Sequence, residues 1–314
     1  MCKPAGAPEK IGWRMVLVEC HPNEVVSWEE FKRLPAPAVA LDGYVEGPPR
    51  QNPTHASFDH HTGVDRLATR ATCEQVALAI RFGPLQLIED PSRLHVHINH
   101  ADEDVCLSVW LLEHQDAVDD PRVRRLVDAE GLLDTTGGCY VPVTDPDFLA
   151  QLAWVFAPCQ RRPRTASTMV RTIREVGRRL GRFTAGKAHR ARTASAYTVL
   201  ERRGRIAAIV EHGPLARAQL RQVGIDMFVS RRYQDGRTEF SIGKTSPYVA
   251  FNLPKAFEEL NRIEGCEGDD VWGGSETIGG SPRRAGSHLA VATVLDVLER
   301  CRDHATGPFL VQAR

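Results

Sequence analysis

Short apolar segments that are followed by turn residues or by a helical segment constrain the fold of this chain most. Residues 13–19, 38–42 and 94–99 are predicted to form short buried strands, and residues 71–81 and 105–114 have the apolar spacing of helices. Strands that alternate with helices predict an α/β fold with a largely parallel sheet flanked by helices. Because ligands bind at the carboxyl ends of the strands in such sheets, the residues that follow the strands are candidates for a site.

The pattern changes from residue 196 onward, where a second, smaller α/β domain is predicted. Strand patterns and helix patterns are interleaved in this half: 196–201, 206–211, 227–232 and 238–243 as strands, and 215–223, 254–263 and 289–302 as helices. No internal repeat is present. The chain is therefore predicted to consist of a first domain over 1–158, a basic connecting segment over 159–195 and a second domain over 196–314.

The formal net charge is zero, but the charges are unevenly distributed. Between residues 160 and 205, fourteen Lys or Arg are opposed only by Glu175 and Glu201, so this segment carries +12 and the rest of the chain −12. Two interpretations are open: a phosphate-rich partner for the basic segment, or a helix face that is simply solvated. Phe183 and Tyr197 are its only aromatic residues, so a platform that stacks single-stranded bases is not evident.

Hydropathy and cysteine spacing argue against a membrane-spanning protein, a secreted protein and a disulfide-rich or thiolate-zinc fold. No apolar run reaches the roughly 18–20 residues of a membrane span, and the first ten residues lack the apolar core of a signal peptide. We therefore expect a cytoplasmic protein that does not bind the membrane. The eight cysteines contain no close pair, so they predict reduced thiols and neither a thiolate zinc site nor a disulfide framework.

Three polar clusters in the first half have the residue types of a metal site. Asp42 ends the segment 38–42, Asp59-His60-His61 follows Ala-Ser-Phe, and His100-Ala-Asp102-Glu-Asp104 follows the segment 94–99. Carboxylate and imidazole ligands without thiolates favour Mn²⁺ or Mg²⁺ over a structural zinc ion. Carboxylates that converge on one crevice repel each other unless cations neutralise them. His95 and His97 alternate with Val96 on the strand and are expected to pack in the core or to support other ligands.

These clusters resemble the motifs of the DHH phosphoesterase superfamily. Asp59-His60-His61 is similar to the name-giving motif, His100 to Asp104 to the motif His-x-Asp-x-Asp, and Asp42 to the isolated Asp at a strand end. Asp134-Thr-Thr-Gly is similar to the fourth motif, Asp-Thr-Gly. In the second half, residues 279–286 resemble Gly-Gly-His-x-x-Ala-Ala-Gly, the substrate-binding signature of the associated C-terminal domain.

The resemblance implies a centre of two divalent ions, Mn²⁺ or alternatively Mg²⁺. Six residues would hold them: His100 and Asp102 on one ion, His60, Asp104 and Asp134 on the other, and Asp42 between the two. Asp59 would orient His60, since metal-bound imidazoles commonly need such a partner. His61 would contact the substrate phosphate and protonate the leaving group. Asp128 and Asp145 remain alternatives to Asp134.

The same resemblance assigns substrate binding to the second half. Gly279 and Gly280 would let backbone N–H groups approach an anionic substrate, beside Ser281, and Arg283 and Arg284 would offer forked donors to a phosphate. Ser281 stands where the superfamily has His, so the role of that His is not carried over.

Two further departures concern the first half. The His-x-Asp-x-Asp motif normally comes first, whereas here it follows the DHH motif, so the order of strands in the sheet must be permuted. A parallel sheet tolerates this, because only the spatial positions of the strand ends matter to the metals. Val105 replaces the usual Gly after this motif.

The function implied by the resemblance is that of a hydrolase, such as an exonuclease or a nucleotide phosphatase. It would cleave a phosphodiester or phosphoanhydride bond of a small phosphorylated substrate or a short oligonucleotide by a two-metal mechanism. A homodimer is compatible with this function. A second hypothesis is a non-catalytic nucleotide- or nucleic-acid-binding protein on a decayed phosphoesterase scaffold. A third is a structural protein with a stray zinc site, which would need tetrahedral ligands.

Overall fold

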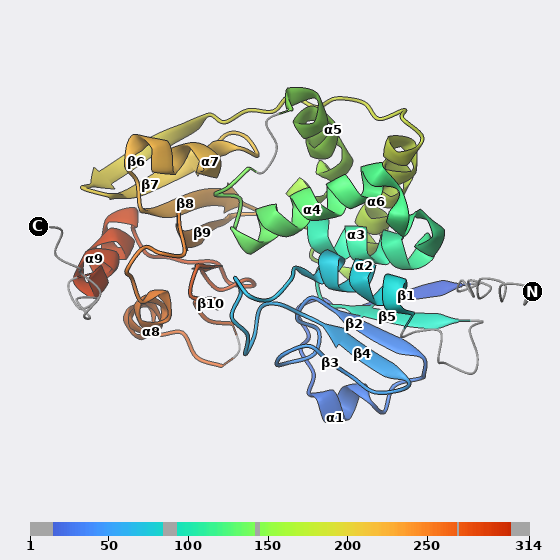
Figure 1. Ribbon diagram of the computed structural model, residues 1–314. Helices are drawn as coiled ribbons and strands as arrows, with labels where there is room; N and C mark the ends of the chain where they lie inside the picture. The colour runs from blue at the N-terminus through green and yellow to red at the C-terminus, as the bar shows by residue number, and fades with distance from the viewer. Residues whose placement is uncertain (1–14, 84–92, 142–144, 269, 303–314) are drawn as a thin grey trace, which may run out of the picture. The chain divides into compact units, whose positions relative to one another are not determined.

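A computed structural model describes residues 15–83, 93–141, 145–268 and 270–302. They form two compact units that are not continuous in sequence (Figure 1): one contains the described residues up to 131 together with 154–189, and the other contains the described residues of 132–153 and those from 190 onward. Each unit has a sheet flanked by helices, so the predicted α/β fold class is confirmed. The functional division into 1–158, 159–195 and 196–314 stays a prediction.

The sheet of the first unit has the strand order β1-β5-β2-β4-β3. Its members are β1 (Val16–Cys20), β5 (Leu94–Ile98), β2 (Ala38–Leu41), β4 (His55–Phe58) and β3 (Arg50–Gln51). The first four are parallel, and only β3 pairs in the antiparallel sense. The predicted strands at 13–19, 38–42 and 94–99 are thus confirmed as β1, β2 and β5 within the described residues.

Both faces of this sheet are covered, as the apolar composition of its strands predicts. All four residues of β2 are buried. One face packs against α1 (Trp28–Phe31), where Phe31 and Tyr44 contact Ala38 and Ala40. The other face is covered by the longer helices of the unit: α2 (Thr72–Phe82), α3 (Glu103–Glu113) and α6 (Ala166–Thr184).

The basic segment contributes the amphipathic helix α6 to the first unit. Apolar residues Met169, Ile173, Val176 and Leu180 are buried at the spacing of a helix face. The cations between them point outward: Arg171, Arg174, Arg178 and Arg182 are exposed. Within α6, the structure therefore favours the solvated-face interpretation of these charges.

The sheet of the second unit has the order β10-β11-β9-β8-β7-β6. Its strands are β6 (Tyr197–Arg203), β7 (Ile206–Glu211), β8 (Met227–Gln234), β9 (Arg237–Lys244), β10 (Gly273–Gly274) and β11 (Ile278–Gly280). Only β7 and β8 are parallel. The four strands predicted from residue 196 onward are confirmed, whereas β10 and β11 had not been predicted.

The helices of the second half also follow the sequence pattern. α8 (Leu253–Glu264) and α9 (Val291–Arg302) correspond to the predicted helices, and residues 215–223 form α7 (Ala216–Leu220) with a short 3₁₀ turn after it. Trp272 and Phe257 lie in the core that α8 and α9 form on the sheet. Two further helices complete the described chain: α4 (Pro121–Thr135) and α5 (Pro146–Phe156).

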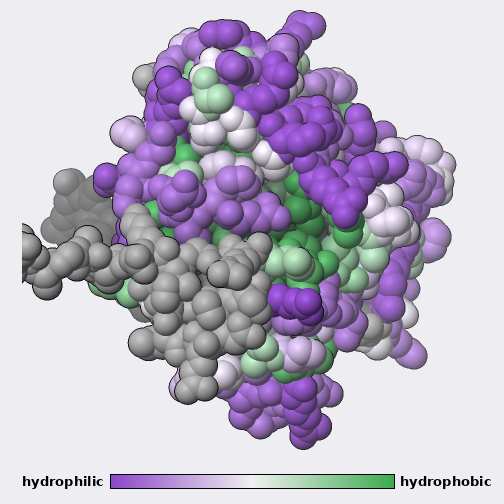
Figure 2. Space-filling view, turned by 90° about the vertical axis from the view of Figure 1, so that its right-hand side faces the viewer, coloured by the Kyte–Doolittle hydropathy of each residue, from purple (hydrophilic) through white to green (hydrophobic). Residues whose placement is uncertain are grey.

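None of the described helices is long and apolar enough to cross a membrane. On the face shown in Figure 2, hydrophilic residues predominate and hydrophobic residues show in smaller areas between them.

The glycine pair at the start of the predicted substrate-binding signature is required by packing. Gly279 and Gly280 lie in β11, which pairs with β9. A Cβ atom on Gly279 would lie 2.5 Å from Cζ of Phe257, and one on Gly280 would lie 2.5 Å from the carbonyl oxygen of Phe240. The second contact is with backbone, so it cannot be relieved by a rotamer change.

We expect Gly280→Ala to lower the free energy of unfolding of the second unit by roughly 1–3 kcal/mol, the usual cost of overpacking. Gly273→Ala in β10 is the matched control, because a Cβ there has no atom within 4 Å. Thermal unfolding of both variants checks this expectation. Equal melting temperatures for the two would contradict it.

Candidate metal centre

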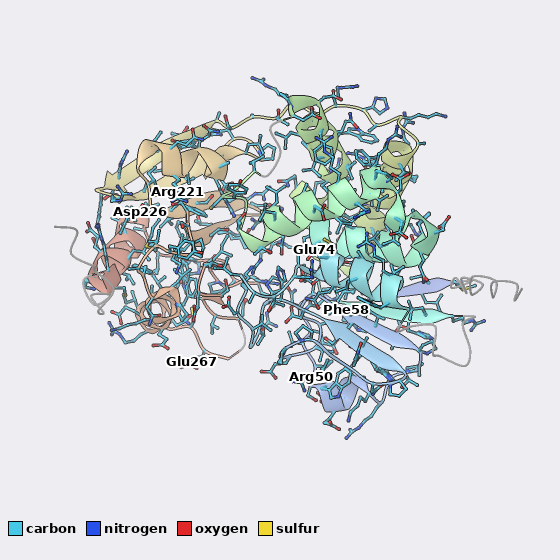
Figure 3. The ribbon with its side chains drawn as sticks, in the orientation of Figure 1. Arg50, Phe58, Glu74, Arg221, Asp226 and Glu267 are labelled. Carbon is cyan, nitrogen blue, oxygen red and sulfur yellow. The ribbon has the colours of Figure 1, made fainter. Side chains whose placement is uncertain are left out.

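Three neighbouring parallel strands bring the predicted metal ligands to one edge of the first sheet. β2 lies between β5 and β4 in register, so the residues that follow these strands come together. Asp42 follows β2, Asp59 and His60 follow β4, and His100 lies two residues beyond β5. Figure 3 labels Phe58, the last residue of β4, directly before Asp59. We refer to Asp42, His60, His61, His100, Asp102 and Asp104 as the primary cluster.

Asp42 lies at the centre of the primary cluster and is 1% exposed. Its Oδ1 is 3.0 Å from Nε2 of His61 and accepts a 2.8 Å hydrogen bond from the hydroxyl of Thr72. Its Oδ2 is 2.9 Å from Nε2 of His100. Burial raises the pKa of Asp42, but the two imidazoles outweigh it and hold the pKa well below its usual range. Both carboxylate oxygens therefore face polar groups, on two different sides.

The backbone at this strand end is constrained as well. Asp42 has φ +53°, and the next residue, Gly43, has φ +86°, a region that favours glycine. The amide of Asn99, at the end of β5, donates a 2.8 Å hydrogen bond to the carbonyl oxygen of Gly43. This bond fastens the end of β5 to the end of β2 and so fixes His100 relative to Asp42.

His100 links Asp42 to Asp102. Its Nε2 lies 2.9 Å from Asp42 and 3.0 Å from Oδ2 of Asp102, and its Nδ1 lies 2.6 Å from the side-chain oxygen of Asn99. Burial lowers the pKa of His100, but the charge of Asp102 and the bonds to both carboxylates raise it well above its ordinary value. Because Nδ1 donates to the side-chain oxygen of Asn99, Nε2 is the nitrogen available to coordinate a cation that lies between the two carboxylates.

His60 and Asp104 form the other side of the primary cluster, and both are almost completely buried. Nε2 of His60 lies 3.6 Å from Asp42 Oδ1 and 3.9 Å from Asp104 Oδ2. These separations exceed those of hydrogen bonds. They suit ligands that share one ion, since metal–ligand distances near about 2 Å place neighbouring ligand atoms about 3–4 Å apart.

The N-terminus of α2 stabilises the negative charge of Asp104. The two carboxylate oxygens accept backbone hydrogen bonds from Thr72 (2.8 Å) and Cys73 (2.6 Å), the first two residues of this helix. Glu74, labelled in Figure 3, accepts from the preceding N–H group of Ala71. The N-terminal N–H groups of a helix favour anions, so this arrangement fixes an ionised Asp104 at a defined place.

Asp59 is fully buried, and its carboxylate holds the turn after β4. Oδ1 accepts from the backbone N–H of His61 at 3.1 Å, and Oδ2 accepts from that of Thr62 at 3.3 Å. Burial raises the pKa of Asp59, and the nearby Asp42 adds to this, while His61 opposes it. The predicted role of Asp59 in orienting His60 stays a prediction.

His61 has a partner that the sequence did not predict. Its side chain is 33% exposed, and its Nδ1 lies 3.0 Å from Nη1 of Arg66. A guanidinium can only donate, so Nδ1 accepts and Nε2 carries the proton that points to Asp42. Arg66, Thr72 and Asn99 had not been singled out from the sequence, since each is an ordinary polar residue whose partner is defined only by the fold.

Asp134 lies in the last turn of α4, and from Leu132 onward this helix belongs to the second unit. Its role as a metal ligand therefore stays a prediction. Of the two alternatives, Asp128 is exposed on α4, and Asp145 accepts hydrogen bonds from the N–H groups of Asp147 and Phe148 at the start of α5. The bonds of Asp145 are those of an N-terminal capping residue.

The predicted substrate-binding residues that follow β11 have defined surroundings within the second unit. Ser281 is buried, and its hydroxyl oxygen accepts a 3.0 Å hydrogen bond from the N–H group of Phe240. Arg283 and Arg284 are exposed. Asp270 accepts from the backbone N–H of Arg284 at 2.9 Å and so fixes the course of the chain there.

Comparisons with known proteins give a likeness in structure but none in sequence. No protein-family model and no curated protein sequence matches this chain. Among solved structures, one is described as a pGpG-specific phosphodiesterase, PggH, of Vibrio cholerae. It is 9% identical in sequence, with a TM-score of 0.34, over 85% of this chain and 97% of that chain.

The primary cluster has the composition of a metal centre. Two of its subsets have ligand atoms within 4.8 Å of one another: Asp42 with His60 and His61, and Asp42 with His100 and Asp102. Asp42 belongs to both. The donor set is therefore suited to divalent cations on either side of Asp42.

We expect Thr72→Val to weaken binding of Mn²⁺ by about 10–100-fold, the usual effect of losing a hydrogen bond that orients a ligand. The change removes the hydroxyl that bonds Asp42 but keeps the backbone N–H that bonds Asp104. Thr72→Ser, which restores the hydroxyl, is the matched control. Titration of metal-free protein with Mn²⁺ measures the affinities, and an unchanged affinity of the valine variant would contradict the role of Thr72.

Proposed function

We propose that this protein is a metal-dependent phosphoesterase that hydrolyses a phosphodiester or phosphoanhydride bond of a nucleotide or a short oligonucleotide. The observation that carries this proposal is the position of Asp42. One of its oxygens faces His60 and His61, and the other faces His100. A buried carboxylate with ligand groups on both sides has the arrangement of a bridge between two cations.

The residues of the primary cluster fit two such ions. His100 and Asp102 would hold one, His60 and Asp104 the other, and Asp42 both, with Asp134 as the proposed additional ligand. The mixture of imidazoles and carboxylates suits Mn²⁺ better than Mg²⁺, which prefers oxygen ligands. When bound, a pair of ions supplies an activated water molecule and charge stabilisation for in-line displacement at phosphorus.

His61 is proposed to act directly on the substrate. Since its Nδ1 accepts from Arg66, its Nε2 holds a proton, and its partial exposure lets a phosphate reach it. An N–H group at this place can donate a hydrogen bond to a phosphoryl oxygen and then transfer the proton to the leaving oxygen. Arg66 would keep His61 in this tautomer and is proposed as a positioning residue.

The second unit is proposed to bind the substrate. Arg283 and Arg284 are exposed and carry forked donors that match phosphate oxygens. The glycines of β11 are accounted for by packing against Phe257 and Phe240, so their proposed contribution is limited to backbone N–H groups. The alternative function, nucleotide binding without hydrolysis, uses the same residues and differs only in turnover.

Turnover with defined substrates separates these two functions. We expect metal-free protein supplied with Mn²⁺ to hydrolyse dinucleotides, bis(p-nitrophenyl) phosphate or pyrophosphate, and a chelator to abolish the reaction. Asp42→Asn should lower kcat by at least about 100-fold, because several kcal/mol of charge stabilisation are lost. Asp116→Asn, an exposed carboxylate in the same unit, is the control. Binding of these compounds without any hydrolysis would favour the alternative.

A second prediction concerns the positioning of His61. Arg66→Met should lower kcat by roughly 10–100-fold, part of the usual contribution of general acid catalysis, while Mn²⁺ content and KM remain close to those of the wild type. Arg66→Lys, which keeps a donor and a charge, should restore part of the loss. A variant in which KM rises and kcat does not change would instead show that Arg66 binds the substrate.

A further inference from the structure

A second group of metal-ligating side chains lies in the first unit and shares no residue with the primary cluster. It comprises Glu19 on β1, His21 directly after β1, and His97 on β5. These three residues have ligand atoms within 4.8 Å of one another. We call them the Glu19 cluster.

The register of the parallel strands places these side chains together. Glu19 is the direct partner of His97 across β1 and β5, although 78 positions separate them in sequence. Nδ1 of His97 lies 3.1 Å from Nε2 of His21 and 3.9 Å from Oε2 of Glu19. Two imidazole nitrogens and a carboxylate oxygen thus surround one point.

The environment of His97 directs one ring nitrogen to this point. The side chain is 1% exposed and stacks on Tyr44, and Phe31 meets its ring edge-on. Its Nε2 has no hydrogen-bond partner among the described residues, so the nitrogen with polar neighbours is the one that faces Glu19 and His21.

Neighbouring histidines have other roles. His95 lies two residues before His97 on the same strand, and its Nδ1 is 2.6 Å from Oε1 of Glu19. This contact occupies one oxygen of Glu19 and leaves the other on the side of His97, in the way that hydrogen bonds orient ligating carboxylates. His55 is excluded, because its two nitrogens already meet Thr54 and the carbonyl oxygen of Leu34.

We propose that Glu19, His21 and His97 form a second metal site that takes a late first-row divalent cation such as Zn²⁺. Two imidazoles and one carboxylate are a ligand set that zinc accepts, with water completing a tetrahedron. Side-chain exposures of 26% for His21 and 40% for Glu19 leave a path for the ion and for that water. A bound cation would fasten the residues that follow β1 to β5.

This site is independent of the proposed hydrolysis, and the experiment keeps the two apart. Zinc binding to the metal-free full-length chain is measured by isothermal titration calorimetry near neutral pH. All variants carry Asp42→Asn, which impairs the primary cluster. Glu19→Gln or His21→Ala is then introduced as a second substitution. His189→Ala in the same background is the control, since His189 is an exposed histidine that contacts Arg182 and Trp154.

We expect the Asp42→Asn protein to bind one Zn²⁺ at the Glu19 cluster. Adding either Glu19→Gln or His21→Ala should weaken the affinity of this binding by at least about tenfold, and adding His189→Ala should leave the affinity unchanged. In the wild-type background, His21→Ala should keep any Mn²⁺-dependent hydrolysis. Equal zinc affinity in all variants would overturn the proposal. So would the absence of this zinc binding in the protein that carries Asp42→Asn as its only substitution. If His21→Ala does not fold, Glu19→Gln, which keeps the size of the side chain, decides the outcome.

Discussion

The mutual repulsion of buried carboxylates is the constraint on which the first unit depends. Asp42, Asp59 and Asp104 are each at most 1% exposed and gather at one edge of a sheet. An isolated buried carboxylate costs far more free energy than a small domain can supply, so each needs a compensating group. The structure supplies imidazoles to Asp42, turn N–H groups to Asp59 and the N-terminus of α2 to Asp104. Divalent cations bound between the imidazoles and carboxylates of the primary cluster would complete this compensation of charge.

The parallel sheet explains why the order of the motifs in the chain is of little consequence. β5 is later in sequence than β4, yet it lies on the other side of β2. Its end therefore reaches Asp42 from the side opposite to His60. In a parallel sheet the carboxyl ends of all strands lie at one edge, so the adjacency of strands decides which ligands meet. The hydrogen bond from Asn99 to Gly43 fixes that adjacency at the site itself.

The first unit contains two donor sets that differ in chemistry. The primary cluster has three carboxylates, Asp42 among them, and three imidazoles, and the Glu19 cluster has two imidazoles and a single carboxylate. Harder cations suit the first and late transition metals the second. A protein with both sites would respond differently to Mn²⁺ and to Zn²⁺, and metal content alone would not identify the ion that supports hydrolysis.

The sequence alone determined the fold class and singled out the residues of the primary cluster as candidate ligands, because both inferences depend on local patterns. The run at β2 is buried and apolar throughout, and Asp42 after it is visible as a break in that run. The strands β1 and β5 are less uniform, because Glu19, His95 and His97 stand among their apolar residues. Only the tertiary structure decided the partners of these groups. Arg66, Thr72 and Asn99 are ordinary polar residues until the fold brings them to His61, Asp42 and His100. The Glu19 cluster was hidden for the same reason, since strand register, which sequence spacing does not encode, places Glu19 beside His97.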